Sequence, residues 1–497
     1  MNFPTGLFST PARIRGRAAL FAALVFGIWL GLIAGSFAAE VRHPNILFII
    51  SDDQRPDTIA ALGNPIIQTP NLDRLVHGGT AFTRAVAAYP ICYVSRAEIL
   101  TSVCAFRNGV GYTGNKLDPK LATWSGTLRS AGYHTWFVGK WDNGATPKAY
   151  GYEETRGLYT GGGAPLQNTP SYVDHAGRPA TGYRGYTFKT DDGKPLPELG
   201  VGLTPDISRH FADAAIDFIE RKPAEPFFLH VAFTAPHDPR LLPPGWETKY
   251  DPKTMPLPKN FRSVHPFDHG NMGGRDEVLL ASPRRPDEVR AELAAYYAAI
   301  SGMDEQIGRI VEALKSTGQL DNTLIIFTSD QGLAVGSHGL IGKQNLYEHT
   351  LGVPLIMSGP GIPKGETREA QCDLRDLFPT TCEVTGIATP PAVQGRSLVP
   401  VLRDAQKTVY PFVVGYYTDA QRAIREGTWK LILYPKAKRT QLFYLASDPD
   451  EMHDLSAQPE QARRLADLRI KLLGWLKENG DPDVEAVAAT PAPSSNP

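Results

Sequence analysis

Short apolar segments alternate with amphipathic segments along most of the chain after residue 45. Five of the apolar segments contain many β-branched or aromatic residues and are bounded by turn residues, which is typical of buried strands. These segments are residues 46–50, 134–138, 227–233, 323–328 and 353–357. The alternation predicts an α/β fold with a large, mostly parallel central sheet that is flanked by helices.

The longest amphipathic segment, residues 286–315, has a helical period. Its apolar side chains recur at spacings of three and four from Leu293 to Leu314, which predicts one apolar face along a single long helix. Residues 141–205 and 236–285 are instead rich in Gly, Pro, Tyr and charged residues. We expect both to be long loops that form a lid or a binding surface.

The chain begins with the pattern of an export signal. Arginines at positions 13, 15 and 17 precede an uncharged apolar run over residues 18–35, and small residues suited to signal-peptidase cleavage follow it. We expect residues 1–39 to be a signal peptide, or else an uncleaved anchor, because about 18 apolar residues is the lower limit for a membrane span. The protein is therefore expected to be exported, as a periplasmic or secreted protein or one anchored by this segment. No other segment is apolar for long enough to cross a membrane.

A change of composition near residues 390–391 marks a second unit of the chain. We expect a large α/β domain over residues 40–395 and a smaller C-terminal α+β subdomain over residues 396–487. The elements predicted for this subdomain are strands at residues 411–417 and 429–434 and an amphipathic helix at residues 459–478. Residues 488–497 are rich in Ala, Pro and Ser, which is typical of a disordered tail.

The charge balance and the cysteine count exclude several classes of protein. Among 497 residues, 51 Lys and Arg oppose 52 Asp and Glu, for a formal net charge of −1, so we expect no nucleic-acid partner that binds through a strongly positive surface. Four cysteines are too few for a scaffold built on disulfides. Cys372 and Cys382 could form one bridge in an oxidising compartment, whereas Cys104 is predicted to pack in the core.

Acidic and amide side chains follow two of the predicted strands directly. Asp52 and Asp53 come after residues 46–50, and Asp330 and Gln331 come after residues 323–328. The carboxyl ends of parallel strands form the edge of an open sheet at which ligands bind. Adjacent carboxylates repel each other unless a cation lies between them, and their oxygens suit a hard divalent metal. The alternative is an ordinary strand exit with solvated acids.

A cysteine and a group of cationic side chains lie beyond other strands. Cys92 precedes Ser95, Arg96 and Glu98, and Ser95 with Glu98 has the pattern of a capping box at a helix start. The N-terminus of that helix and Arg96 would favour an anion, although an isolated cysteine is more often a buried apolar residue. The further candidates, each just past a predicted strand or acid pair, are Lys140, His237 and Lys343.

In their order and spacing, these motifs resemble the formylglycine-dependent (type I) sulfatases of the alkaline-phosphatase superfamily. The similarity covers nearly the whole chain after the export signal and makes residues 40–395 the catalytic domain. The segments that carry it are residues 44–53, 69–75, 92–102, 139–141, 236–237, 328–343, 423–431 and 442–445.

The resemblance implies a specific mechanism. A formylglycine-generating or equivalent maturation enzyme would oxidise Cys92 to formylglycine, whose hydrate attacks the sulfur of a sulfate ester. One Ca²⁺ would be held by the modified cysteine together with acidic and amide residues, and it would neutralise the sulfate oxygens. The implied metal ligands are Asp52, Asp53, Cys92, Asp330 and Gln331. Arg96 would bind the diol, Lys140, His237 and Lys343 would hold the sulfate, and His237 or Lys343 would protonate the departing oxygen.

The chain departs from the family pattern at two informative positions. Asp142 stands where the family usually has a histidine that contacts the diol, and it is a candidate proton acceptor; Val94 stands where the modification signature usually has Pro or a small residue. Two alternatives stay open. One is a phosphate or phosphonate ester hydrolase of the same superfamily, because tetrahedral dianions resemble sulfate in shape; the other, which Asp142 and Val94 suggest, is a degenerate, non-catalytic binder of sulfated glycans. The expected ligand is a sulfated small molecule or glycan, because the composition of the long loops suits a carbohydrate.

Overall fold

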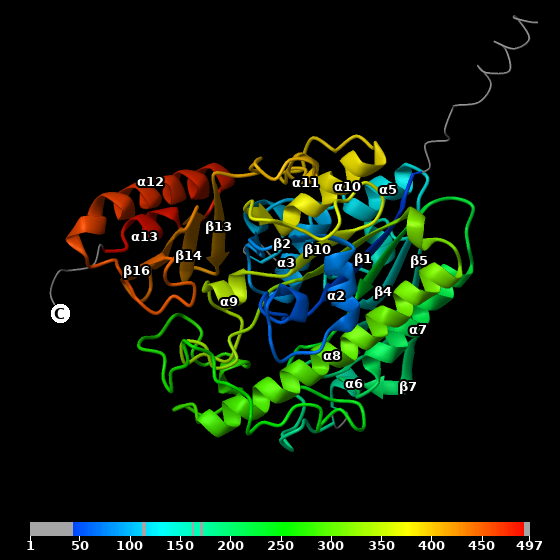
Figure 1. Cartoon of the computed structure of the whole chain (residues 1–497), viewed down its shortest axis with the longest axis horizontal. Helices are drawn as coiled ribbons and strands as arrows, with labels where there is room; N and C mark the ends of the chain where they lie inside the picture. The colour runs from blue at the N-terminus through cyan, green and yellow to red at the C-terminus, as the bar shows by residue number, and fades with distance from the viewer. Residues whose placement is uncertain (1–42, 112–115, 162–163, 169–171, 492–497) are drawn as a thin grey trace, which may run out of the picture. The chain divides into compact units, whose positions relative to one another are not determined.

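A ten-stranded mixed sheet forms the centre of the described chain, which comprises residues 43–111, 116–161, 164–168 and 172–491 of the computed structural model (Figure 1). In spatial order the strands are β11 (Glu366–Arg368), β2 (Gly79–Phe82), β10 (Leu355–Ser358), β9 (Thr323–Ser329), β1 (Asn45–Ser51), β8 (Phe227–Ala232), β4 (His134–Lys140), β5 (Glu154–Gly161), β6 (Tyr186–Lys189) and β7 (Pro195–Val201). The strands β9, β1, β8, β4 and β5 are parallel, whereas β10, β6 and β7 are antiparallel to their neighbours. The predicted α/β fold is therefore confirmed. The predicted signal peptide, residues 1–39, lies outside the described residues.

Helices cover both faces of this sheet. The helices of the described chain, in chain order, are α2 (Pro70–His77), α3 (Cys92–Thr101), α4 (Ala105–Asn108), α5 (Trp124–Ser130), α6 (Ala164–Gln167), α7 (Ile207–Glu220), α8 (Pro286–Ser316), α9 (Glu348–Leu351), α10 (Leu377–Thr385), α11 (Val399–Arg403), α12 (Ala462–Asn479) and α13 (Val484–Ala488). Leu47 and Ile49 of β1 belong to a core shared with α2, α7 and α8, and Figure 1 shows α7 and α8 side by side. Ile46 and Phe48, which point to the other face, belong to a core shared with α3, α5 and α10. Because both faces are covered, the central strands are largely apolar on both sides.

The five strands predicted from apolar segments are confirmed as β1, β4, β8, β9 and β10, and the predicted long helix is confirmed as α8. The prediction of a loop over residues 141–205 is wrong, because this segment contains β5, β6 and β7 and extends the sheet. These strands lie at the sheet edge, where Pro195–Val201 has no buried residue. Edge strands of this kind lack the apolar pattern that identifies buried strands. Residues 236–285 do form a long connection, with one short 3-10 turn at Glu277–Leu279.

A separate antiparallel sheet of four strands lies in the C-terminal part of the chain. Its strands are β13 (Phe412–Tyr417), β14 (Gln421–Glu426), β15 (Trp429–Tyr434) and β16 (Arg439–Tyr444), so the predicted strands 411–417 and 429–434 are confirmed. The predicted helix corresponds to α12, which covers this sheet (Figure 1). Arg422 of β14 donates from Nε to Asp481 Oδ2 at 2.6 Å, and both side chains are fully buried. This buried ion pair attaches the segment after α12 to the sheet.

The described chain includes the first residues of the expected tail, residues 488–491. Thr490 is buried, and the hydroxyl of Thr440 donates to the carbonyl of Pro491 at 2.8 Å. Residues 492–497 lie outside the described residues.

All four cysteines are buried free thiols. Cys372 lies in β12 (Cys372–Asp373), which pairs with β3 (Ala85–Val86), whereas Cys382 lies in α10, so the bridge considered above is not formed. Cys104 is fully buried, as predicted, and it directly precedes α4. Within the described ranges, no helix has both the length and the apolar character that a bilayer span requires.

A cluster of buried histidines lies near the loop that follows β9. The ring of His338 stacks on Tyr347 with 4.0 Å between ring centroids, and His349 lies 5.7 Å from His338. His265 lies 2.9 Å, through its Nδ1, from the carbonyl of His338, and its ring packs against His269 with 5.4 Å between centroids. Burial lowers the pKa of His265 to about 4 and the pKa of His338 to about 3, so these imidazoles are neutral at pH 7.

Candidate active site

The polar side chains singled out in the sequence converge at the carboxyl ends of four adjacent strands. Asp52 and Asp53 follow β1, Asp330 follows β9, and Lys140 ends β4. His237 lies five residues beyond the end of β8. Because β9, β1, β8 and β4 are neighbours in the parallel part of the sheet, the four strand ends bring these groups to one place, as the edge of an open α/β sheet does.

The two adjacent acids bind different cations. Asp52 accepts a hydrogen bond at Oδ2 from Lys140 Nζ at 2.8 Å, and Asp53 accepts from Lys343 Nζ at 2.9 Å on both oxygens. Both acids are completely buried. Asp53 has a left-handed backbone, with φ of 70°, so the chain turns sharply between the strand and the following loop. Each carboxylate is thus compensated by its own lysine.

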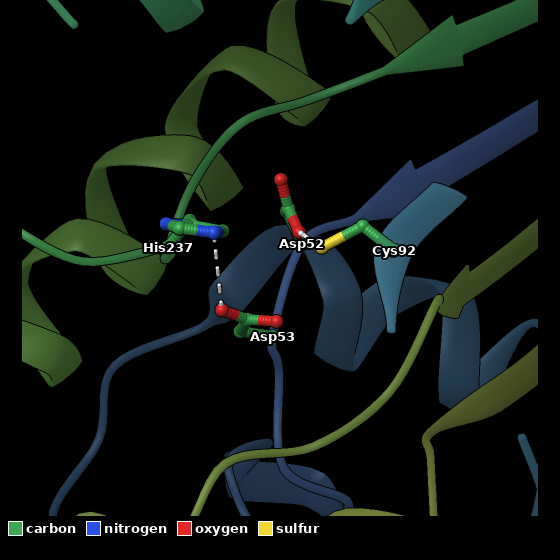
Figure 2. A group of neighbouring side chains, drawn as sticks. All are labelled: Asp52, Asp53, Cys92 and His237. Carbon is green, nitrogen blue, oxygen red and sulfur yellow. Dashed lines mark hydrogen bonds and ion pairs between the residues drawn. The ribbon is translucent and has the colours of Figure 1, made fainter. Parts of the chain in front are cut away.

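The sulfur of Cys92 points towards Asp52 within this group (Figure 2). This atom lies 3.2 Å from Asp52 Oδ1, 3.0 Å from Lys343 Nζ and 3.2 Å from Gln331 Nε2. Cys92, Asp52, Asp53 and His237 each offer one atom that could ligate a metal, and these four atoms lie within 4.8 Å of one another. The cysteine therefore faces acids and a lysine rather than an apolar core.

The predicted capping box before α3 is wrong. The helix begins at Cys92, and its N-cap residue, Ile91, has an extended backbone without a side-chain cap. Ser95 lies inside the helix, where its hydroxyl donates to the carbonyl of Asp330 at 2.6 Å. Glu98 accepts from the backbone N–H of Ala105 at 2.6 Å. Tertiary partners for both side chains replace the local capping interaction, and the helix start places Cys92 itself in the site.

Asp330 and Gln331 join the cluster through hydrogen bonds. Asp330 accepts from Arg96 Nε at 2.8 Å and from the backbone N–H of Asp53 at 3.1 Å. The side-chain amide of Gln331 donates to Asp53 Oδ1 as well as to the sulfur of Cys92. The loop after β9 is thereby fixed to the loop after β1.

His237 and Lys343 form a hydrogen-bonded pair. His237 Nε2 lies 2.9 Å from Lys343 Nζ, and its Nδ1 lies 2.6 Å from the carbonyl of Asp238. Because an ammonium group can only donate and a carbonyl can only accept, the imidazole carries its proton on Nδ1. His237 also lies 3.7 Å from Asp53 (Figure 2). The pair thus presents a charged lysine and a neutral, oriented histidine to the same space.

Asp142 lies beside the site, next to Lys140. Its Oδ2 is 3.2 Å from Lys140 Nζ, and its side chain is 11% exposed. All the residues predicted for the site are therefore brought together: Asp52, Asp53, Cys92, Arg96, Lys140, Asp142, His237, Asp330, Gln331 and Lys343.

No pattern in the sequence singles out Tyr183, which lies in the segment that we expected to be a loop. Its hydroxyl donates to Asp52 Oδ2. Its ring packs against His237 with 4.8 Å between centroids, and Lys140 Nζ lies 5.0 Å from the ring centroid. One of several tyrosines between residues 172 and 186 cannot be singled out by type alone, because the contact depends on how β6 pairs with the sheet.

Burial and neighbouring charges give the three acids different protonation behaviour. Burial alone would raise the pKa of Asp52, but the charge of Lys140 helps to hold it well below 3.8. Burial, together with the like charges of Asp52 and Asp330, raises the pKa of Asp53 to about 8 in spite of Lys343. Burial and Asp52 also raise the pKa of Asp330 to about 6. Confining three carboxylates in so small a space therefore favours a bound cation.

The bases and the thiol are also perturbed. Burial and the charge of Asp52 raise the pKa of the Cys92 thiol well above 9.0, so an unmodified Cys92 is protonated and a poor nucleophile. Burial and Lys343 hold the pKa of His237 well below 6.5. Burial opposes the charge of Lys343, but the Asp53 carboxylate raises the pKa of that lysine well above 10.5.

Three polar atoms around the cysteine are buried and have no hydrogen-bond partner among the described residues. They are Gln331 Oε1, Arg96 Nη2 and Asp142 Oδ1. Buried polar groups are normally paired, and a spare amide oxygen beside two carboxylates suits a hard cation. The unpaired N–H at Arg96 Nη2 suits a ligand oxygen as its acceptor.

A second group of potential metal ligands, Asp174, His175 and Glu292, lies elsewhere. Both acids are already paired, because Arg178 binds Asp174 and Glu292, and Arg240 donates to Glu292 Oε2 at 2.6 Å. With two guanidinium groups compensating two carboxylates, this cluster connects the segment around residue 175 to α8 and has no need of a metal.

The chain matches known proteins over most of its length. The family model described as Sulfatase matches residues 44–387, and the one described as N-sulphoglucosamine sulphohydrolase, C-terminal, matches residues 336–478. An arylsulfatase of Clostridium perfringens is 29% identical over 456 residues, which cover 87% of this chain and 94% of that protein. An N-acetylglucosamine-6-O-sulfatase of Bacteroides thetaiotaomicron is 27% identical, with coverage of 89% and 88%.

Solved structures of similar fold extend this comparison. A protein in complex with its substrate D-glucosamine-2-N,6-O-disulfate superposes with a TM-score of 0.74 and 25% identity, over 89% of this chain and 99% of that chain. A phosphonate monoester hydrolase of Agrobacterium radiobacter gives a TM-score of 0.73 at 22% identity, over 88% of this chain and 96% of that chain. The second likeness concerns the fold alone.

Proposed function

Because the chain belongs to the sulfatase family and is an enzyme that hydrolyses sulfate esters, we propose that Cys92 provides its nucleophile after oxidation to formylglycine. The observation that carries this proposal is the surrounding of the buried Cys92 sulfur by Asp52, Lys343 and Gln331 within 3.2 Å. An unmodified thiol with a raised pKa would be a poor nucleophile there. As formylglycine hydrate, the residue supplies an oxygen nucleophile and a second hydroxyl group.

We also propose that the site holds one Ca²⁺. The proposed ligands are the oxygens of Asp52, Asp53, Asp330 and Gln331 together with the modified Cys92. Ca²⁺ takes six to eight oxygen ligands, and the unpaired Gln331 Oε1 together with the raised pKa of Asp53 supports such an ion. When bound, the ion supplies positive charge against the oxygens of the sulfate group.

The other side chains have complementary roles in this proposal. Arg96, fixed by its bond to Asp330, has a free Nη2–H for the diol. Lys140 and Lys343 bind the sulfate oxygens. Lys343 holds the proton for the departing alcohol oxygen, because His237 Nε2 is its acceptor and carries no proton of its own. His237 then orients the ammonium group rather than donating to the substrate itself.

The proposed substrate is a sulfated carbohydrate. Two similar proteins are named for, or bind, sulfated glucosamine derivatives, and the long connection at residues 236–285 offers room for loop-borne specificity. The likeness to phosphonate hydrolases supports the fold but not that activity.

We further propose that the protein is exported by residues 1–39, and cell fractionation of the native host tests this directly.

Two measurements test the proposal. Peptide mass spectrometry of the segment around Cys92, from protein made in the native host, should find an aldehyde in place of the thiol. Sulfate release from a panel of aryl sulfates, sulfated monosaccharides and sulfated polysaccharides should then identify the substrate. A Cys92→Ala variant is the control and should release none. A wholly unmodified cysteine in active protein would eliminate the formylglycine mechanism.

A further inference from the structure

We infer that Asp142 makes the site discriminate against ligands that carry two negative charges. On this inference, which rests on the proposed function, Asp142 favours monoanionic sulfate esters over dianionic phosphate esters and also promotes release of the dianionic product, inorganic sulfate. Asp142 is thus a specificity-determining residue of the same site.

The position of the Asp142 carboxylate supports this role. Asp142 Oδ2 lies 3.2 Å from Lys140 Nζ, and the same nitrogen lies 2.8 Å from Asp52 Oδ2. Lys140 is 2% exposed and Asp142 is 11% exposed, so water screens their charges weakly. The negative charge of Asp142 therefore acts directly on a cation that we propose to bind the sulfate group.

The orientation of the carboxylate also matters. Asp142 Oδ1 is buried and has no hydrogen-bond partner among the described residues. A carboxylate oxygen without a donor keeps its charge unneutralised on that side. Asp142 thus adds negative charge to the site that no hydrogen-bond donor offsets at Oδ1.

The charged groups that pair with one another around Cys92 and Lys140 are consistent with a monoanionic ligand. Four carboxylates, those of Asp52, Asp53, Asp330 and Asp142, face three fixed cations at Arg96, Lys140 and Lys343. With all four carboxylates ionised, as ligation of the proposed Ca²⁺ would require, five positive charges oppose four negative ones, and the balance is one positive charge. One positive charge matches the single negative charge of a sulfate monoester. Without Asp142, the balance would suit a dianion.

The expected size of the effect follows from Coulomb's law. A phosphate monoester carries two negative charges above about pH 7, since its second pKa is about 6. A ligand oxygen in contact with Lys140 would lie about 6 Å from the Asp142 carboxylate, and at an effective dielectric constant of about 20 the additional charge corresponds to about a 100-fold loss in affinity. Removing the charge of Asp142 should recover about 10- to 100-fold of this, because neighbouring groups relax.

The experiment compares the wild-type protein with Asp142→Asn, which keeps the shape of the side chain and removes its charge. Calorimetric titration with inorganic sulfate, in the presence of Ca²⁺, should show about 10- to 100-fold tighter binding to D142N. The ratio of kcat/KM for 4-nitrophenyl sulfate to that for 4-nitrophenyl phosphate should fall by a similar factor. Asp142→Glu, which keeps the charge, should retain weak sulfate binding and wild-type selectivity.

Asp217→Asn serves as the matched control, because Asp217, in α7, is 42% exposed and pairs with Arg156 and Arg221. It should change neither readout. Equal sulfate affinity of D142N and the wild type, or an equal loss of kcat/KM for both esters, would overturn the inference. A wild-type protein that releases no sulfate from any ester would contradict the proposed function, whereas the sulfate titration needs no turnover and still decides the role of Asp142.

Discussion

His349 provides a direct test of how burial controls protonation in this fold. The side chain is buried, and neither ring nitrogen has a hydrogen-bond partner among the described residues. Burial and the nearby charge of Arg55 hold its pKa well below 6.5. In the unfolded chain the imidazole returns to a pKa of about 6.5. Unfolding in mild acid therefore takes up one proton at this position.

The magnitude follows from proton linkage. Because the folded pKa is depressed, the stability contributed by neutral His349 is complete above the unfolded pKa and decreases as the pH falls towards the folded pKa. Between about pH 7.5 and pH 5.5, one such histidine lowers the free energy of unfolding by about 1.4 kcal/mol. His349→Phe removes the titrating group and breaks no hydrogen bond of the described residues, so the variant should lose about 1.4 kcal/mol less than the wild type over this interval.

The assay is urea unfolding followed by tryptophan fluorescence at the two pH values. The quantity of interest is the difference between the variant and the wild type at each pH, so the acid dependence of all other groups cancels. His77→Gln is the control, because His77 is exposed at the end of α2 and its surroundings change little on unfolding. If the stability difference between H349F and the wild type is the same at both pH values, the imidazole is not held neutral by burial.

Three further predictions concern the active site. Asp52→Ala should lower Ca²⁺ affinity and activity by at least about 100-fold, since a buried ligand oxygen is lost; full activity in chelator-treated variant protein would contradict the metal assignment. Tyr183→Phe should weaken Ca²⁺ binding about 10-fold in titrations, because the phenol orients a ligand carboxylate, whereas Tyr186→Phe should not, and equal affinities would contradict this role. Lys343→Ala should reduce turnover of alkyl sulfates about 100-fold more than that of nitrophenyl sulfate, because poor leaving groups need a proton; an equal loss on both would assign the proton elsewhere.

The central sheet and the ends of its strands could be predicted because both faces of the sheet are covered. Burial makes the interiors of β1, β8 and β9 largely apolar, and an acidic residue shortly after such a run lies at the edge of the sheet. Asp52 and Asp330 were identified in this way. The edge strands could not be identified, because β7 is exposed and has no buried residue.

The sequence identifies the residues of the candidate site that follow the predicted strands, but it does not predict all the contacts between them. The start of α3 was misplaced because Ser95 and Glu98 have distant partners, the carbonyl of Asp330 and the N–H of Ala105, in place of the local ones. Tyr183 was missed for a related reason: its contact with Asp52 spans 131 residues of sequence. Pairs this distant in sequence depend on the folded sheet, so no local pattern specifies them.

The burial of Cys92 determines when the cysteine can be modified relative to folding. In the folded chain the side chain of Cys92 is only 7% exposed and lies beneath Lys343, Asp52 and Gln331. An oxidising enzyme cannot reach a sulfur so enclosed. The maturation that we propose must therefore act on the nascent or still unfolded chain, in competition with folding. The yield of active protein from a host would then depend on how fast the maturation enzyme acts relative to the folding of the segments that enclose Cys92.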